Sequence, residues 1–254
     1  MRRGAIWAGA AVALLAAGCG SSGGGSSSAT TTAAGPSSPP WELHGTYAPK
    51  LDPADFVATI DNRWFPLVPG TTFHYAGVKD GARQTDDMAV TRQTRQVAGI
   101  TATVVRDTVS QGGRVIERTY DWYAQDRQGN VWYLGEDSLE RDKGKLVRAS
   151  DSWETGVNGA RPGIIVSGHP QPGDVYRQEY YPPGEALDQA HVLGLDAHQR
   201  VPAGSYGHLL ATEEWSPVEP QMEQKFYAPG LGEVKEKVVA GGHEEFELVG
   251  VTHG

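Results

Sequence analysis

From residue 71 onward, apolar and polar side chains alternate along the chain, and this pattern constrains the fold more than any other feature of the sequence. A period of two places successive side chains on opposite faces of a β-strand. Glycine-containing turns separate the alternating stretches, as in antiparallel hairpins. The predicted strands are residues 71–78, 87–97, 101–110, 114–125, 131–135, 145–152, 175–181, 191–201, 208–215, 222–227, 232–239 and 244–251. The sequence therefore predicts a mainly β protein built as an antiparallel meander.

The strand-rich part of the chain also repeats itself at nearly one offset. The matched segments are residues 69–73 with 172–176, 97–105 with 201–210, and 122–124 with 226–228. They predict two pseudo-repeats, about residues 69–150 and 172–252. Neither unit would close a core alone, so we expect the two to share one continuous sheet, curved into an unclosed β-barrel.

One short helix is predicted before the first strand. Asp52 can cap its N-terminus, and Pro53 suits the first helical position. Phe56, Val57 and Ile60 would then form one apolar stripe along the helix. We expect this short N-terminal helix to pack against the sheet.

The N-terminus has the layout of a secretory signal. Arg2 and Arg3 precede an apolar run at residues 5–17, which is too short to span a membrane. Cys19, the only cysteine of the chain, follows directly. This segment resembles a bacterial lipoprotein signal peptide, in which the cysteine is lipidated and becomes the first mature residue. One departure is Ala16, which stands where that family usually has leucine.

The resemblance implies three regions. Residues 1–18 would be removed as a signal peptide, residues 19–40 would carry the lipid and form a tether, and residues 41–254 would form the β domain. The tether contains no charged or aromatic side chain, so it cannot bury enough apolar surface to offset its ordering entropy. A flexible chain of this length reaches about 25 Å. The expected location is therefore extracytoplasmic, with the acyl chain on Cys19 inserted into the lipid bilayer.

The charge balance narrows the possible partners. The chain has 31 acidic and 22 basic residues, which gives a formal net charge of −9. An acidic domain held at an anionic membrane surface disfavours nucleic-acid binding. We therefore expect no nucleic-acid partner.

Three further segments carry a resemblance to a family. They are residues 61–70 (DNRWFPLVPG), 120–126 (YDWYAQD) and 226–234 (FYAPGLGEV). Together they resemble secreted bacterial lipoproteins grouped as TapB-like or as domain-of-unknown-function families, over most of residues 51–251. By architecture, the resemblance implies an unclosed β-barrel similar to the LolA/LolB-like carriers of lipoproteins and lipids. It implies no reaction and no catalytic residues.

Aromatic side chains supply the candidate ligand site. The hairpin at residues 120–133 is the densest aromatic segment, with aromatic side chains on both strand faces. These can either pack against each other across strands or line an apolar pocket inside a half-barrel. The second alternative predicts a hydrophobic small molecule, a lipid or an apolar peptide as the ligand. The candidate ligand-binding residues are Trp64, Tyr75, Tyr120, Trp122, Trp132, Tyr176 and Tyr227.

No catalytic or metal site is predicted, and no cofactor. The histidines lack zinc-ligand spacing, and no GxSxG motif exists. Residues 126–130 resemble half of a calcium loop, but a plain hairpin turn explains them better. The alternative functions are a secreted hydrolase of envelope glycan or ester and a non-catalytic structural envelope protein. An apolar cavity inside the sheet would favour binding, converging carboxyls would favour catalysis, and a filled interior would favour a scaffold.

Overall fold

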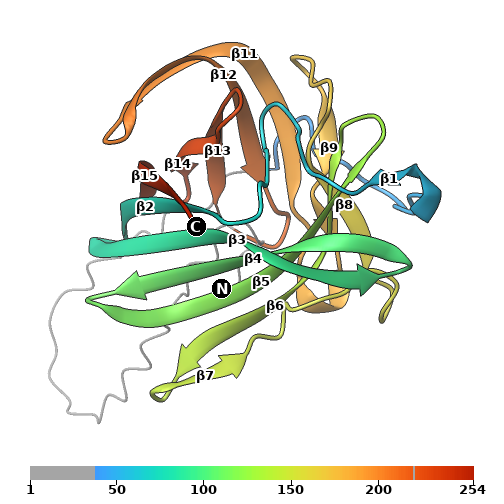
Figure 1. The fold of residues 1–254 in the computed structure, drawn as a ribbon, viewed down its shortest axis with the longest axis horizontal. Helices are drawn as coiled ribbons and strands as arrows, with labels where there is room; N and C mark the ends of the chain where they lie inside the picture. Colours follow the sequence, from blue (N-terminus) through green and yellow to red (C-terminus); the bar gives the residue numbers. More distant parts are fainter. Residues whose placement is uncertain (1–37, 220) are drawn as a thin grey trace, which may run out of the picture.

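The computed structural model describes residues 38–219 and 221–254 of the chain. Cys19, the predicted signal peptide and most of the predicted tether lie outside these residues. Nearly all the regular secondary structure of the described residues is antiparallel β-strand (Figure 1), and the strands join in one sheet of 15. The sheet curls into a nearly closed barrel, so the predicted mainly β, unclosed-barrel fold is confirmed.

The strands follow one another as hairpins. The first part of the chain contains β1 (Phe56–Val57), β2 (Thr71–Lys79), β3 (Ala82–Val97), β4 (Ile100–Gln111), β5 (Arg114–Asp126), β6 (Val131–Asp142), β7 (Lys145–Arg148) and β8 (Arg161–Val166). The second part contains β9 (Val175–Arg177), β10 (Glu179–Tyr180), β11 (Gln189–Val201), β12 (Gly204–Trp215), β13 (Met222–Ala228), β14 (Gly232–Ala240) and β15 (Glu244–His253).

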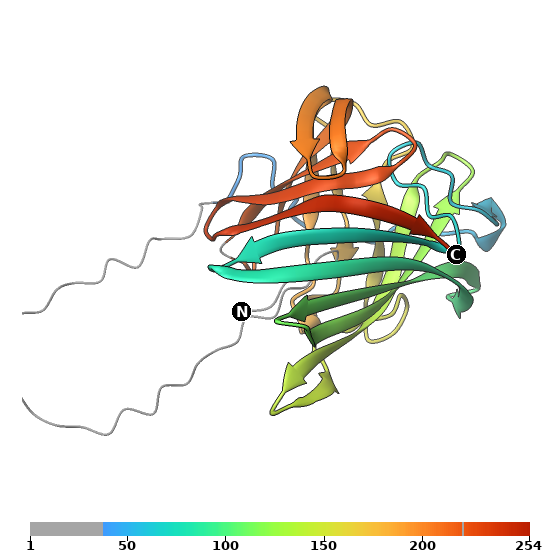
Figure 2. The same ribbon diagram turned by 60° about the vertical axis from the view of Figure 1, so that its left-hand side comes forward.

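The two parts of the chain join where the first long strand meets the last. Strands β2 and β15 pair antiparallel along their whole length, and Figure 2 shows them side by side as the teal and red arrows. The sheet runs in the order β10-β8-β6-β5-β4-β3-β2-β15-β14-β13-β12-β11-β9. Its two edges, β9 and β10, are consecutive in the chain. The barrel therefore has one seam that is not sealed by strand pairing.

The sequence matches fall on comparable elements of the two parts. Residues 97–100 and 201–204 are the tight turns of the hairpins β3–β4 and β11–β12. Residues 122–124 lie in β5, and residues 226–228 lie in β13. A common origin of the two units stays a prediction.

The predicted helix at residues 52–60 is wrong beyond its first turn. Only η1 (Pro53–Asp55) is helical, as a single 3-10 turn. Asp52 caps it as expected, because its side chain accepts a hydrogen bond from the backbone N–H of Ala54 at 2.9 Å. Phe56 and Val57 instead form β1, which pairs with the end of β5. Pairing with an existing strand outweighs a helix too short to stabilise itself.

Strand β8 is missing from the sequence prediction. It starts at Arg161 and contains Pro162 and Gly163, which read as a turn rather than as a strand. Gly163 permits a close approach, because a Cβ atom there would lie 2.2 Å from the backbone of Gln178. The predicted strand at residues 175–181 is divided into β9 and β10, which pair with different neighbours.

Hydrophobic side chains form two clusters, one on each face of the β3–β6 region. The inner cluster lies in the barrel interior and contains Phe65, Tyr123 and Tyr133. The outer cluster contains Trp122, with Trp132 packed against it. Because alternate residues of β5 and β6 enter different clusters, this strand pair is covered on both faces.

Candidate functional site

The structure divides the seven candidate aromatic residues between the two clusters. Trp64, Tyr75 and Tyr227 belong to the inner cluster, and Tyr176 packs against it. Trp122 belongs to the outer cluster, and Tyr120 and Trp132 pack against it. The seven side chains therefore do not form one pocket lining.

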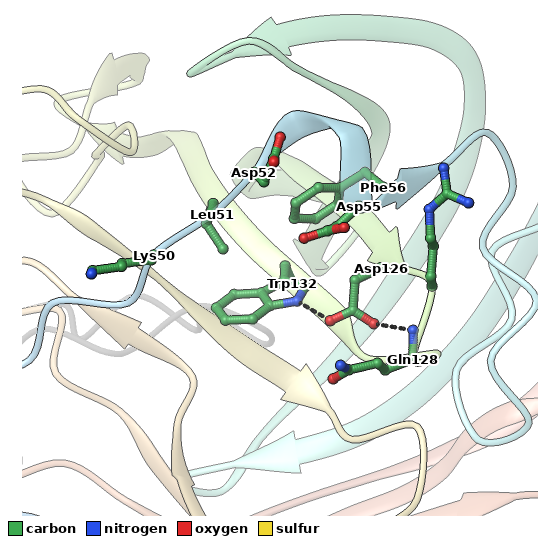
Figure 3. A pocket seen from close by; sticks show the side chains of 9 residues that line it. Lys50, Leu51, Asp52, Asp55, Phe56, Asp126, Gln128 and Trp132 are labelled. Atoms are coloured by element: carbon green, nitrogen blue, oxygen red, sulfur yellow. Dashed lines mark hydrogen bonds between the residues drawn. The ribbon is translucent and has the colours of Figure 1, made fainter.

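The outer pocket lies between the N-terminal segment and the turn that joins β5 to β6 (Figure 3). It encloses about 230 Å³ and has an apolar floor made by Leu51, Phe56 and Trp132. A pocket of this size is below the ordinary range for drug-sized ligands. The remaining lining residues are Lys50, Asp52, Asp55, Asp126, Arg127 and Gln128.

Asp126 has a structural role in this pocket. One carboxylate oxygen accepts hydrogen bonds from the backbone N–H groups of Gln128 and Asn130, both at 2.9 Å. The other accepts from the Asn130 side chain and from Trp132 Nε1, both at 2.8 Å (Figure 3 shows the bond to Trp132). These bonds hold residues 126–130 as a hairpin turn rather than as a calcium loop. The carboxylate of Asp126 has little capacity left for a ligand.

An aromatic bridge crosses the barrel interior. Phe65, from the segment before β2, contacts Tyr123 edge-on with a centroid distance of 5.6 Å and Tyr227 at 6.3 Å. Tyr123 stacks on Tyr133 at 4.9 Å, and Tyr133 meets Trp153 edge-on at 5.3 Å. These five side chains link β5 and β6 to β13 across the barrel. The bridge closes one part of the interior with apolar packing.

Carboxyl groups occupy another part of the interior, and the sequence reasoning missed them. Asp86 in β3, Asp107 in β4, and Glu117 and Asp121 in β5 are all buried. The alternation of side chains along β5 could have indicated the inward position of two of these acids, because Glu117 and Asp121 lie on the same face of the strand as Tyr123. Their position inside the barrel depends on strand register, which the sequence does not state.

We call Asp86, Asp107 and Glu117 the carboxyl cluster. Val109 of β4 is the cross-strand partner of both Asp86 and Glu117, and Asp107 precedes Val109 by two residues on the same face. The side chains are 0 %, 6 % and 2 % exposed. Burial raises the pKa of Asp86 to about 7, although a hydrogen bond with the Asp107 side chain opposes the rise and the nearby Glu117 charge adds to it. Burial and the neighbouring acids raise the pKa of Asp107 and Glu117 well above their usual values, although the charge of Lys79 opposes the rise at Glu117.

A pair of buried acids lies beside the aromatic bridge. Asp121 and Glu136 face each other across β5 and β6. Tyr133 lies between them, with its hydroxyl oxygen 2.7 Å from Asp121 Oδ1 and 3.0 Å from Glu136 Oε2. One hydroxyl carries one proton, so one of the two carboxyls must be protonated and donate to the Tyr133 oxygen. Burial is the main reason that the pKa of Asp121 rises to about 8.

The Asp121–Glu136 pair does not have the geometry of a glycosidase couple. Such enzymes place the sugar linkage, and in some cases a water molecule, between their two carboxyls. Here the hydroxyl of Tyr133 occupies the space between them. The converging carboxyls therefore do not by themselves favour the hydrolase alternative.

The opposite wall of the barrel holds a buried cation. Lys225 of β13 lies 3.0 Å from Glu214 Oε2 of β12 and 3.5 Å from Glu236 Oε2 of β14, and all three side chains are buried. Burial lowers the pKa of Lys225, but the two carboxylates outweigh it and raise that pKa well above its usual value. Tyr227 also donates a hydrogen bond to Glu214 at 3.3 Å. We call this set the lysine cluster.

Over residues 38–219 and 221–254, no group of three or more histidine, aspartate or glutamate side chains has an arrangement that could hold a metal ion. In the same part of the chain, no helix is long and apolar enough to cross a bilayer.

Comparisons with known proteins give fold-level likenesses at low identity. No protein-family model matches the chain, and no curated protein sequence is significantly similar to it. A crystal structure of a Bacteroides fragilis protein, inferred to be exported and described as having a YMCC-like fold, aligns with a TM-score of 0.45 and 14 % identity. The alignment covers 75 % of this chain and 99 % of that chain.

A second solved structure has a similar degree of likeness. It is a Parabacteroides distasonis protein inferred to be a lipoprotein, with a TM-score of 0.42, 10 % identity and coverage of 76 % of this chain and 100 % of that chain. Neither is described as TapB-like or as a LolA/LolB carrier, so the resemblance to those groups stays a prediction. Likeness at this level gives no information about a ligand or an activity.

Proposed function

We propose that this protein is an extracytoplasmic lipoprotein that binds a ligand with a large apolar part inside its β-barrel. The observation that carries this proposal is the composition of the barrel interior. An extensive set of aromatic and aliphatic side chains lies next to buried ionisable side chains, among them Asp86, Asp121 and Lys225. Small-molecule sites generally combine a mostly apolar wall with a few polar groups.

The buried ionisable side chains favour a binding function over a structural one. A buried polar group that loses its hydrogen bonds costs about 1–3 kcal/mol. A protein that serves only as a scaffold gains nothing from such groups, and most folded proteins contain few of them. Local exceptions of this kind are expected at functional sites.

The proposed anchoring rests on the sequence of the N-terminal segment. Acylation of Cys19 would fix the domain to the outer side of the membrane through a tether that reaches about 25 Å. Metabolic labelling with palmitate tests this directly. We expect label on the wild-type chain and none on the Cys19→Ala variant. Label retained by the variant would contradict the anchoring proposal.

Ligand binding is tested on the full-length protein purified from membranes in a mild detergent. We expect native mass spectrometry to detect a co-purified molecule in a fixed ratio to the protein, and solvent extraction to release it. A preparation that carries no such molecule and also takes up no apolar fluorescent probe would contradict the proposal. An empty detergent preparation, treated identically, controls for molecules that the detergent itself retains.

A further inference from the structure

We propose that the outer pocket binds a methylated ammonium group, such as that of choline, between the rings of Phe56 and Trp132 and beside the carboxylate of Asp55. The outer pocket is separate from the barrel interior, so this inference does not rest on the proposed function. It adds a second ligand class, a small organic cation. Free solutes and the headgroups of lipids both carry this chemistry.

The first argument is that the pocket contains two aromatic rings that do not contact each other. Phe56 of β1 and Trp132 of β6 line the same cavity of about 230 Å³. Among the ring contacts formed by the described residues, none joins these two side chains. In the view of Figure 3, the Asp55 carboxylate lies between them. A group smaller than a drug-sized ligand can therefore contact both rings and this carboxylate.

The second argument is that the Trp132 ring is fixed and its hydrogen-bond donor is already in use. Its Nε1 atom donates to Asp126 Oδ2 at 2.8 Å. The negative charge of Asp126 at the edge of the indole polarises the ring and strengthens the attraction of its face for a cation. A ligand therefore meets this ring as an apolar, electron-rich surface and not as a hydrogen-bond donor.

The third argument is that the lining carries more acids than cations. The acids are Asp52, Asp55 and Asp126, and the cations are Lys50 and Arg127. Among the ion pairs formed by the described residues, none involves Asp55. A cation is therefore the ligand whose charge complements this pocket.

The two cations of the lining are directed away from the space between the rings. Arg127 donates from Nε and Nη2 to the carbonyl oxygen of Ala54, at 3.2 Å and 3.0 Å. Figure 3 shows the Lys50 side chain extending away from Asp55 and Trp132. The chain therefore leaves this space to a cation from outside.

A neighbouring ring of the outer cluster shows the same kind of arrangement with a cation present. Arg95 places its guanidinium carbon 4.0 Å from the centroid of the Trp122 ring. The same guanidinium pairs with the carboxylate of Glu154 at 2.6 Å. Among the cation–ring contacts of the described residues, none involves Phe56 or Trp132. The outer pocket thus offers rings and a carboxylate, and the ligand would supply the cation.

The apolar floor selects among cations. Leu51, Phe56 and Trp132 form this floor, and none of them offers a strong hydrogen-bond acceptor. A primary ammonium is strongly hydrated and has three donors, which this floor would leave without partners. The methyl groups of a quaternary ammonium need no acceptor and can pack against apolar side chains, and aromatic rings recognise such cations. A methylated ammonium therefore fits the pocket better than a primary one.

The test compares three water-soluble probes that share a hydroxyethyl group: choline, its uncharged carbon analogue 3,3-dimethylbutan-1-ol, and ethanolamine. Binding to the full-length protein in a maltoside detergent is measured by ligand-detected NMR titration at pH 7.5, with detergent alone as the blank. We expect choline to bind at least about tenfold more tightly than either of the other two. The carbon analogue lacks the charge that the rings attract, and ethanolamine lacks the methyl groups that the floor accommodates.

Two variants and a matched control identify the site. Trp132→Leu removes a ring but keeps an apolar side chain, and Asp55→Asn removes an exposed charge. We expect each to weaken choline binding at least about fivefold and to change binding of the carbon analogue by less than about twofold. Asp142→Asn, an exposed acid at the end of β6, should leave choline binding unchanged. Thermal unfolding checks that each variant is folded, and the comparison of probes on the wild-type protein needs no variant.

A fourth probe, glycerophosphocholine, distinguishes the two sources of the cation. If it binds as tightly as choline, the site accepts a lipid headgroup, and if it binds more weakly, the site takes a free solute. Both results support the inferred cation site.

Three results would overturn the inference. If the carbon analogue or ethanolamine binds as tightly as choline, the pocket does not recognise a methylated cation. If no probe of the series binds, the pocket is not a binding site for this class. If Asp142→Asn weakens choline binding as much as Asp55→Asn does, the preference is a general charge effect. None of these results changes the proposed function, which concerns the barrel interior.

Discussion

The two walls of the barrel interior differ in how they accommodate buried acids. The lysine cluster on β12–β14 places Lys225 between two carboxylates, and hydrogen bonds from Thr212 and Tyr227 complete the surroundings of Glu214. The carboxyl cluster on β3–β5 buries three acids, of which Asp86 and Asp107 hydrogen-bond to each other. The first wall therefore places a cation among its buried acids, whereas burial in the second favours the protonated form of the acids.

The two walls are otherwise alike in their aromatic packing. Tyr123 and Tyr227 occupy matching positions of the predicted sequence repeat, and both contact Phe65 from opposite sides of the interior. The similarity in apolar packing makes the difference in charge more informative. Packing keeps the walls together, and the charge pattern distinguishes them.

The largest expected effect comes from removing the cation of the lysine cluster. Lys225→Met leaves Glu214 and Glu236 buried without their ion-pair partner, and we expect the free energy of unfolding to fall by about 3–5 kcal/mol. Urea unfolding followed by tryptophan fluorescence measures it. Lys145→Met, at an exposed position of β7, is the matched control and should change it by less than about 0.5 kcal/mol. Equal effects of the two substitutions would show that Lys225 does not stabilise the buried acids of its wall, and the contrast between the walls would be lost.

The corresponding change in the carboxyl cluster should have the opposite sign. Burial raises the pKa of Asp86 from 3.8 to about 7 in the folded protein, so folding favours its protonated form. Stability contributed by this group is therefore lost as the pH rises from about 4 to about 7. The loss is at most about 4 kcal/mol, at 1.36 kcal/mol for each unit of pKa.

Asp86→Asn cannot ionise, so the ligand-free variant should be more stable than wild type at pH 8 and similar to it at pH 4. Urea unfolding at both pH values, with Asp87→Asn as the control, measures the difference. If the stability of Asp86→Asn depends on pH as steeply as that of wild type, burial does not raise the pKa of Asp86.

A smaller effect is expected from weakening the aromatic bridge that the two walls share. Phe65→Leu keeps an apolar side chain but loses two edge-on ring contacts, to Tyr123 and Tyr227. Each such contact contributes about 0.5–1.5 kcal/mol, so the free energy of unfolding should fall by about 1–3 kcal/mol. Adding Tyr227→Leu should then cost less than it does in wild type, because the contact is already lost. Strict additivity in this double-mutant cycle would exclude the bridge.

The smallest effect is expected at a surface ion pair. Arg148 contacts Asp137 at 2.6 Å, but both side chains are exposed. Exposed pairs contribute about 0.2–1 kcal/mol and are screened by salt. Arg148→Ala should therefore lower stability by less than about 1 kcal/mol, and the difference should shrink in 1 M salt. A loss as large as that of Lys225→Met would show that burial does not set the scale of these effects.

The alternation of side chains predicted most of the strands but not their exceptions. Strand β8 begins with Arg161, Pro162 and Gly163, and only its close contact with Gln178 explains why it is a strand. The helix expected around Phe56 and Val57 is replaced by β1 because the end of β5 offers hydrogen bonds that local sequence does not reveal. Tertiary contacts decide both cases.

The candidate site was only partly predictable for a related reason. Trp122 and Tyr123 are neighbours in β5, yet one enters the outer cluster and the other the aromatic bridge. The sequence shows that they point in opposite directions but not which direction is the interior. The acids share the phase of Tyr123, so they were detectable as inward-facing once that direction was known. The contribution of three strands to one cluster follows from register alone.

The most direct measurement is an experimental structure of the full-length protein purified from membranes in a mild detergent. We expect a bound molecule in the barrel interior, with its apolar part against side chains of the inner cluster. An interior packed without a bound molecule, or a molecule bound only in the outer pocket beside Trp132 and Asp55, would contradict the proposed function.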